Sequence, residues 1–164
     1  MLQVELQWGI EPLALPTQTL CERWVAESLT AIQSSPQHTE LTIRIVSLEE
    51  SQTLNQTYRN KSKPTNVLSF EFEPPVGLPD GVLDEEGGEK FYLGDLAICA
   101  EVVAQEAEQQ NKLLEAHWAH MIVHGTLHLQ GFDHIETKDA LIMETLEVKI
   151  MRKLGYANPY GAYE

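Results

Sequence analysis

Cysteine is scarce in this chain of 164 residues: only Cys21 and Cys99 are present, and neither belongs to a CxxC pair. Two isolated cysteines exclude a disulfide-rich scaffold and a cysteine-ligated zinc ribbon. They are more typical of small, buried apolar residues, so we interpret both as structural.

Long apolar runs are also missing. No window reaches the ~18 apolar residues of a membrane span. The N-terminal MLQVELQWGIEPL lacks the basic start and apolar centre of a signal peptide. We therefore expect a cytoplasmic protein that does not associate with membranes.

Basic residues are few: 11 stand against 25 acidic ones, which gives a formal net charge of −14. This balance argues against a protein that coats nucleic acid by broad charge neutralisation. It leaves room for an enzyme that holds a phosphate with a few local basic groups. Part of the acid lies in PPVGLPDGVLDEEGGEK, residues 74–90, whose Pro, Gly and carboxylates predict an exposed loop.

The apolar pattern alternates between the periods of strands and helices. Strands are predicted at residues 3–8, 40–46, 66–72 and 91–99, the last apolar on both faces and therefore central. Helices are predicted from capping boxes at Thr19/Glu22 and Ser47/Glu50, from Ala100 to Gly131 with a break near Asn111, and over about 138–153. Because the order is not a regular βαβ repeat, we predict an α+β fold. A single domain, residues 1–164, would place helices over a small, mostly β-sheet layer.

The stretch HGTLHLQGFDH, residues 124–134, carries most of the chemical information. At about 100° per residue, His117, His120, His124 and His128 project into one narrow sector of a helix. A straight helix supplies at most an i, i+4 pair to one zinc ion, because eight residues already span about 12 Å. A third ligand must therefore return from outside the helix.

Gly131 provides the turn that such a return needs. A glycine three residues after His128 can adopt the left-handed conformation that ends a helix, and the chain then leads directly to His134. The array matches the metzincin pattern HExxHxxGxxH everywhere except at the glutamate, which is replaced by Gly125. We predict one metal ion on His124, His128 and His134. Three neutral nitrogens favour zinc, although nickel or iron also fit the ligand type.

Other readings of these residues stay open at this point. A histidine-rich surface helix, or core histidines satisfied by hydrogen bonds, would produce part of the same pattern. His117 and His120 fit a structural role at least as well as a catalytic one. Asp133 fits both an orienting partner of a ligand imidazole and a simple turn residue.

The motifs resemble those of a known family. HGTLHLQGFDH resembles the HGxLHLxGYDH motif of the YbeY-type endoribonucleases, which are bacterial ribosomal-RNA maturation factors. LNQTYRNKSKPTNVLSFEFE resembles that family's LNxxYRxKxxPTxVLSF segment, and LGDLAIC its LGDI strand. Phe132 replaces the commoner tyrosine, and Ser62 stands where aspartate is frequent; neither change removes a proposed ligand.

The resemblance implies more than the spacing does. It implies a metzincin-like metal helix in an α+β fold, metal ligands at His124, His128 and His134, and a functional arginine at Arg59. It further implies cleavage of single-stranded RNA in maturation of the small-subunit rRNA 3′ end and in ribosome quality control. The expected partners are the small ribosomal subunit and assembly factors.

Gly125 bears on the reaction independently of the resemblance. A metzincin glutamate gives peptide hydrolysis general acid–base help worth roughly 10²–10⁴-fold, and glycine cannot. Cleavage of RNA demands stabilisation of a charged phosphorane instead, which a metal and a cation can supply. We predict that Arg59 clamps a non-bridging phosphate oxygen with its planar fork. A helix-end arginine favoured by the macrodipole is the alternative for Arg59, and a surface role is the alternative for Lys61 and Lys63. Attack by the 2′-hydroxyl and attack by hydroxide both stay open.

Two other functions compete with the endoribonuclease. One is a zinc-dependent hydrolase or peptidase of metzincin-like type, which the spacing favours and Gly125 opposes. The other is a non-catalytic ribosome assembly factor with structural zinc. A site with three histidines and an open position argues for chemistry, because structural zinc sites are usually closed by four protein ligands.

Overall fold

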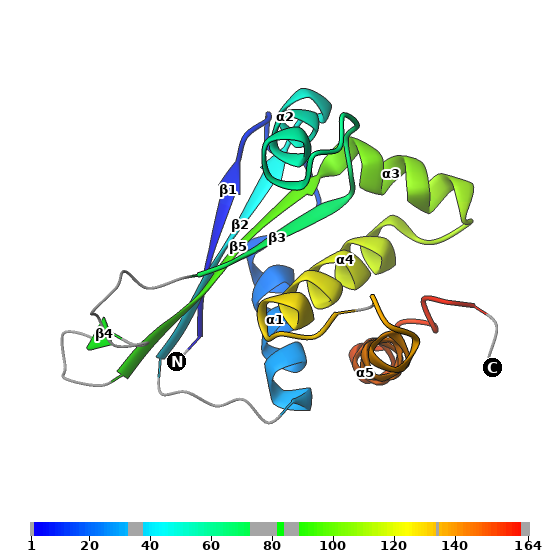
Figure 1. Cartoon of the computed structure of the whole chain (residues 1–164). Helices are drawn as coiled ribbons and strands as arrows, with labels where there is room; N and C mark the ends of the chain where they lie inside the picture. Colours follow the sequence, from blue (N-terminus) through cyan, green and yellow to red (C-terminus); the bar gives the residue numbers. More distant parts are fainter. Residues whose placement is uncertain (1, 33–37, 73–81, 84–88, 134, 162–164) are drawn as a thin grey trace.

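A computed structural model describes residues 2–32, 38–72, 82–83, 89–133 and 135–161. The elements follow in the order β1 (Leu2–Trp8), α1 (Gln18–Ala31), β2 (His38–Val46), α2 (Leu48–Arg59), β3 (Val67–Glu71), β4 (Val82–Leu83), β5 (Glu89–Cys99), α3 (Ala100–Gln109), α4 (Leu114–Leu129) and α5 (Thr137–Leu154) (Figure 1). The α+β prediction is confirmed. Among the described residues, no helix is long and apolar enough to cross a membrane.

The strands form one mixed sheet in the order β1-β2-β5-β3, with β4 paired to the far end of β5. β1, β2 and β5 are parallel, whereas β3 pairs antiparallel with β5 and forms an edge of the sheet. β5 is central, as its two apolar faces predicted. Within the predicted 74–90 loop, the described positions are strand, because Val82 and Leu83 pair with Lys90 and Glu89. The other positions of that loop lie outside the described residues.

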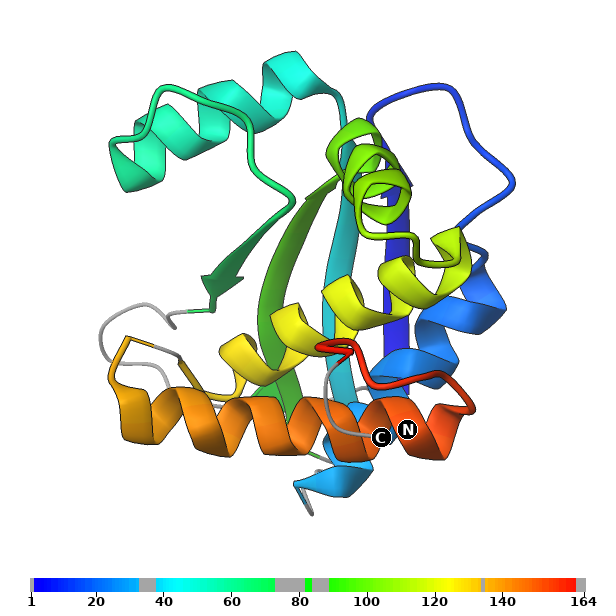
Figure 2. The ribbon, with the colours of Figure 1, turned by 90° about the vertical axis from the view of Figure 1, so that its right-hand side faces the viewer.

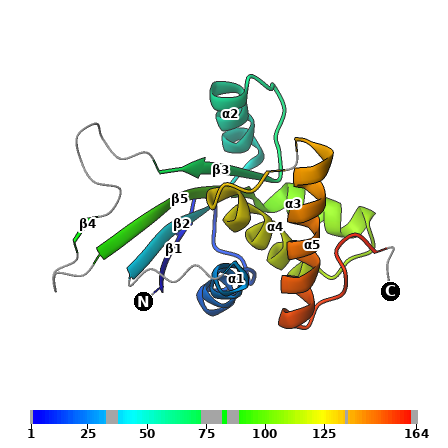
Figure 3. The ribbon, with the colours of Figure 1, turned by 60° about the horizontal axis from the view of Figure 1, so that its bottom comes forward.

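Helices cover the sheet unequally. α1, α4 and α5 lie on one face and α2 on the other (Figure 3). α4 crosses the strands and α5 lies over α4 on the side away from the sheet (Figure 2). Alternation along β2 explains the larger core, since Leu41, Ile43 and Ile45 all point towards α1 and α4 and are fully buried. Each such side chain stabilises the fold by roughly 1.5–3 kcal/mol.

The helix ends follow local chemistry, with one correction. α1 begins after Thr17, whose Oγ1 accepts a hydrogen bond from the backbone N–H of Leu20 (3.1 Å), so the predicted cap at Thr19 is wrong. Both threonines suit an N-cap position, and residue type alone does not choose between them. The cap at Ser47 is confirmed by its contact with the N–H of Glu50 (3.1 Å). The Glu50 carboxylate does not complete the predicted box; it pairs with Arg44 (2.7 Å).

The break and the two glycine ends predicted for the last helices are confirmed. Asn111 separates α3 from α4 with a φ of 54°, and Gly131 and Gly155 follow α4 and α5 with φ of 93° and 94°. Cys21 and Cys99 are free and buried, as expected for structural residues. Burial raises the pKa of the Cys21 thiol to about 12, so it stays protonated at neutral pH.

Candidate metal centre and groove

The α4 histidines divide into two groups by burial. His117 and His120 are buried, and His124 and His128 are half-buried at the end of α4 that faces β3. The His124 and His128 rings lie 4.6 Å apart between centroids, and their Nε2 atoms are 3.2 Å apart. The i, i+4 spacing therefore brings these two imidazoles together, as the sequence predicts.

The separation of the two Nε2 atoms fits a shared metal ion. Two nitrogens bonded to one tetrahedral zinc at ~2.0–2.1 Å stand about 3.3 Å apart. The same distance also suits an N–H···N hydrogen bond between the rings. The third predicted ligand, His134, lies outside the described residues.

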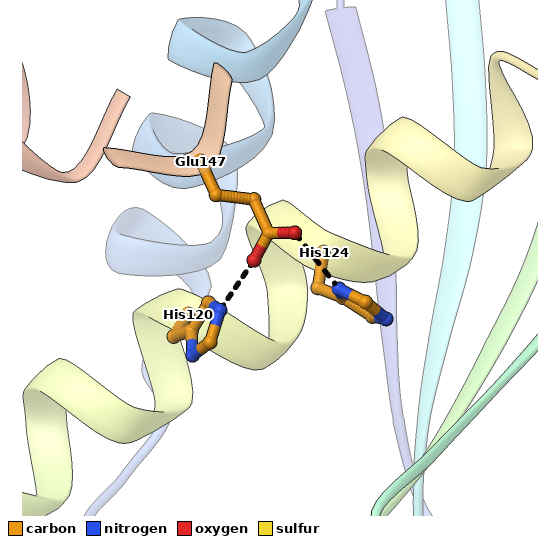
Figure 4. A group of neighbouring side chains, drawn as sticks. All are labelled: His120, His124 and Glu147. Carbon is orange, nitrogen blue, oxygen red and sulfur yellow. Dashed lines mark hydrogen bonds and ion pairs between the residues drawn. The ribbon is translucent and has the colours of Figure 1, made fainter. Parts of the chain in front are cut away.

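Glu147 of α5 points towards His120 and His124 of α4 (Figure 4). Its carboxylate lies 3.2 Å from His124 Nδ1 and also forms a hydrogen-bonded contact with His120 Nε2. Its side chain is only 1% exposed. Burial raises the pKa of Glu147, but hydrogen bonds from the two histidines outweigh it and lower the pKa to about 2.

His120, His124 and Glu147 form a buried group that could itself hold a metal ion, since one ligand atom from each lies within 4.8 Å of the others. In this structure His120 Nε2 and Glu147 Oε2 contact each other directly as hydrogen-bond partners. The group forms a hydrogen-bonded cluster whose atoms are also close enough to serve as metal ligands.

Tyr160, from the segment after α5, completes this cluster. Its hydroxyl donates to Glu147 Oε2 (2.8 Å), and its ring lies edge-on to His120 with centroids 5.4 Å apart. Burial raises the pKa of Tyr160, and the Glu147 charge acts in the same direction. The phenol therefore stays protonated and acts as a donor at neutral pH.

His117 belongs to a separate contact. Its Nε2 lies 3.0 Å from Glu106 Oε1 of α3, and burial lowers the pKa of the ring. The structural role that the sequence left open for His117 is therefore the one the contacts favour.

Arg59 lies at the wall of a groove that also contains His124 and His128. Arg59 ends α2, and its guanidinium donates to Ser69 O of the edge strand β3 (2.8 Å) and lies 5.4 Å from the Phe70 ring centroid. The groove has a volume of about 760 Å³. Lys61, Lys63 and Asp133 also line it.

The loop after α2 is held by side chains of that helix. Asn55 Nδ2 donates to Lys63 O (2.8 Å), and Ser51 Oγ donates to Thr65 O (2.9 Å). Ser51 and Asn55 are buried even though they are polar, because the loop satisfies them. These bonds hold the lysine-bearing loop, which lines the groove, against α2.

Asp133 makes a local contact. Its carboxylate accepts a hydrogen bond from the backbone N–H of Ile135 (3.2 Å). Of the two roles considered for Asp133, this contact is that of the turn residue.

Gly125 is explained by packing as well as by chemistry. α4 approaches β5 so closely that a Cβ at Gly125 would lie 2.7 Å from Leu96 Cδ2 and 3.0 Å from Leu96 Cδ1. Leu96 is fully buried in the central strand. A metzincin-type glutamate at this position would therefore require the Leu96 side chain to shift.

We expect Gly125→Ala to destabilise the protein by about 1–2 kcal/mol. Overpacking a core lowers the free energy of unfolding by roughly 1–3 kcal/mol, and the higher helix propensity of alanine offsets up to ~1 kcal/mol of that loss. Urea unfolding should show the loss. In a Leu96→Val background the same change should become neutral or stabilising. A Gly125→Ala protein more stable than wild type would contradict the close contact.

Sequence reasoning missed Glu147. Met143, Glu147, Ile150 and Leu154 are all buried on one face of α5. A carboxylate at a core position of an amphipathic helix is the signal that marks it, because such a group must find a partner inside.

Fold and site together define a class: an α+β protein with a histidine cluster able to hold a metal ion, next to a groove that contains an arginine and two lysines. The family model described as "Endoribonuclease YbeY" matches residues 12–155. The chain belongs to the YbeY endoribonuclease family, and the predicted resemblance is thereby confirmed.

Relatives support this membership along nearly the whole chain. The endoribonuclease YbeY of Colwellia psychrerythraea is 52% identical over 158 residues, covering 96% of each protein. That of Alcanivorax borkumensis is 49% identical over 159 residues, covering 96% of this chain and 86% of the relative. The solution structure of TM1509 from Thermotoga maritima matches with a TM-score of 0.56 at 20% identity, covering 100% of this chain and 97% of that one. This last likeness concerns the fold alone.

Proposed function

We propose that this protein is a metal-dependent endoribonuclease that cleaves single-stranded RNA in ribosomal RNA processing. The proposal includes maturation of the small-subunit rRNA 3′ end, ribosome quality control, and association in the cytoplasm with the small subunit and its assembly factors. It treats residues 1–164 as one endoribonuclease domain. Membership of the YbeY family supports the reaction class.

The single observation that carries the proposal is the shared groove. His124, His128 and Arg59 all line it, and Lys61 and Lys63 add positive charge in a protein whose net charge is −14. A local cluster of cations beside two imidazoles suits a phosphodiester, whose charge needs both positioning and stabilisation.

The proposed ligands of one zinc ion are His124 and His128 through Nε2, with His134 as the third. The 3.2 Å between the two Nε2 atoms supports the first pair. Neutral imidazoles favour zinc, and another divalent transition metal also suits them. A metal held there would supply Lewis-acid stabilisation of charge on phosphate oxygens.

Arg59 is the proposed catalytic residue. Contacts with Ser69 O and the Phe70 ring hold the guanidinium at the groove wall, so little ordering remains to be done when the phosphate arrives. Two parallel N–H groups can then donate to two phosphate oxygens and stabilise their growing charge.

One observation favours a second candidate function. The buried group of His120, His124 and Glu147 would suit a structural metal in a non-catalytic ribosome assembly factor. The peptidase alternative has no comparable support, because Gly125 stands where peptide hydrolysis would use a glutamate.

The metal content of the purified protein is measured first. The metal-loaded protein should then cleave single-stranded RNA, leave a duplex of matched sequence largely intact and leave casein intact. Removing the metal with a chelator should abolish cleavage, and adding zinc back should restore it. Casein hydrolysis with intact RNA would contradict the proposal. Equal cleavage by metal-free protein would exclude metal dependence, and inactive variants would reveal any contaminating ribonuclease.

A further inference from the structure

The two oxygens of the Glu147 carboxylate accept hydrogen bonds from three donors. Oε1 lies 3.2 Å from His124 Nδ1, and Oε2 contacts His120 Nε2 and the Tyr160 hydroxyl. Figure 4 shows both imidazoles of α4 turned towards this one side chain of α5. The residue is buried, so water does not replace these donors.

We infer that Glu147 is a positioning residue of the metal centre, which fixes the ring orientation and tautomer of His124 so that Nε2 is presented to the metal. This inference rests on the proposed function for the identity of His124 as a ligand. It concerns a residue outside the HGTLHLQGFDH segment and outside α4.

The tautomer follows from hydrogen-bond chemistry. An ionised carboxylate only accepts, so the Nδ1 of His124 must carry the proton in that contact. A neutral imidazole with its proton on Nδ1 has its lone pair on Nε2. That atom is the one 3.2 Å from His128 Nε2. The side of the ring that Glu147 leaves available is therefore the side on which the two imidazoles meet.

The remaining contacts hold the carboxylate itself. His120 lies one helical turn before His124, and Tyr160 comes from beyond the end of α5. Oε2 accepts from both, so the carboxylate cannot rotate without breaking bonds inside the core. A carboxylate behind a ligand imidazole orients the ring and raises its basicity, and losing such a partner commonly lowers metal affinity by about 10–100-fold.

Glu147→Gln tests the role without changing the shape of the side chain. A glutamine offers one acceptor oxygen and one NH₂ group, so it cannot accept from His124 and from His120 together. If the NH₂ group faces His124, the proton of that ring must move to Nε2, the metal-binding atom. We expect zinc affinity, measured by competition with a chromophoric chelator, to fall roughly 10–100-fold.

Glu106→Gln is the matched control, since it alters a second carboxylate–histidine contact on α4, to His117 (3.0 Å), away from the His124–His128 pair. Zinc affinity should be unchanged in this variant. Thermal unfolding of both metal-free variants separates loss of fold from loss of ligand orientation. Equal zinc affinity of Glu147→Gln and wild type would overturn the inference while leaving the proposed centre in place. A wild-type protein that binds neither zinc nor another divalent transition metal would overturn both.

A measurement on the wild-type protein makes the test independent of any variant. Long-range ¹H–¹⁵N spectra of the metal-free protein at neutral pH report which ring nitrogen of each histidine carries the proton. The inference requires His124 to be protonated on Nδ1. A His124 ring that carries its proton on Nε2 and none on Nδ1 would contradict the inference.

Discussion

Replacing His128 with alanine should abolish tight zinc binding and lower RNA cleavage by roughly a thousandfold or more. The proposed centre loses one of its two described ligands, and Lewis-acid stabilisation by a metal is worth several kcal/mol, at ~1.4 kcal/mol per tenfold in rate. His128 is half-buried and its Nε2 is 3.2 Å from that of His124. Metal content of the purified protein and cleavage of a single-stranded RNA are the two measurements.

His128 is the informative choice because it is not part of the His120, His124 and Glu147 group. If that group held the ion, the His128→Ala protein would keep wild-type zinc content. That result would support the alternative of a structural metal. His117→Gln is the matched control on the same helix, since His117 contacts Glu106 instead of the groove. It should retain both zinc and cleavage.

Local sequence rules predicted the elements well because each depends on neighbouring residues. Leu41, Ile43 and Ile45 alternate with polar residues and so define the buried face of β2. Gly131 and Gly155 end their helices because the left-handed conformation suits glycine. The start of α1 was misplaced by two residues, because Thr17 and Thr19 have the same capping chemistry and only the three-dimensional path of the chain selects one.

Helical periodicity predicted the site only where it lies within one helix, whereas Arg59 of α2 was indicated by the family resemblance. His124 and His128 are i, i+4 neighbours, so helical periodicity alone brings their rings together. Glu147 acts on His124 only because α5 packs over α4, and no local pattern gives that arrangement. The steric reason for Gly125 likewise depends on Leu96, a residue of the central strand, whose distance from α4 is a property of the packed fold.

Replacing Arg59 with alanine should leave zinc content unchanged and reduce kcat for RNA cleavage by about 10²–10³-fold. Removing one preorganised donor that stabilises developing charge typically has an effect of this size. The side chain is exposed and its contacts are with Ser69 O, Tyr58 O and the Phe70 ring. The free energy of unfolding should therefore change by no more than about 0.5 kcal/mol. Single-turnover cleavage of a defined single-stranded RNA measures the loss.

Two further variants separate the guanidinium from simple positive charge. Arg59→Lys keeps the charge but loses the planar fork, so it should recover only part of the activity. Lys63→Ala removes a charge from the same groove and should weaken binding more than turnover. If Lys63 contacts one phosphate, its loss should reduce the magnitude of the slope of log K against log salt concentration by about 0.7.

The division between kcat and KM decides the role of Arg59. A raised KM with unchanged kcat would mean that the arginine binds the ground state and the transition state equally, as a phosphate anchor does. Equal losses in kcat and in kcat/KM would mean that the contact forms only as charge develops on the phosphate. The hold of Ser69 O and the Phe70 ring on the guanidinium favours the second outcome, because a cation fixed before the substrate arrives needs no reorganisation during the reaction. Wild-type cleavage by Arg59→Ala would remove this residue from the mechanism and return it to the role of a helix-end arginine.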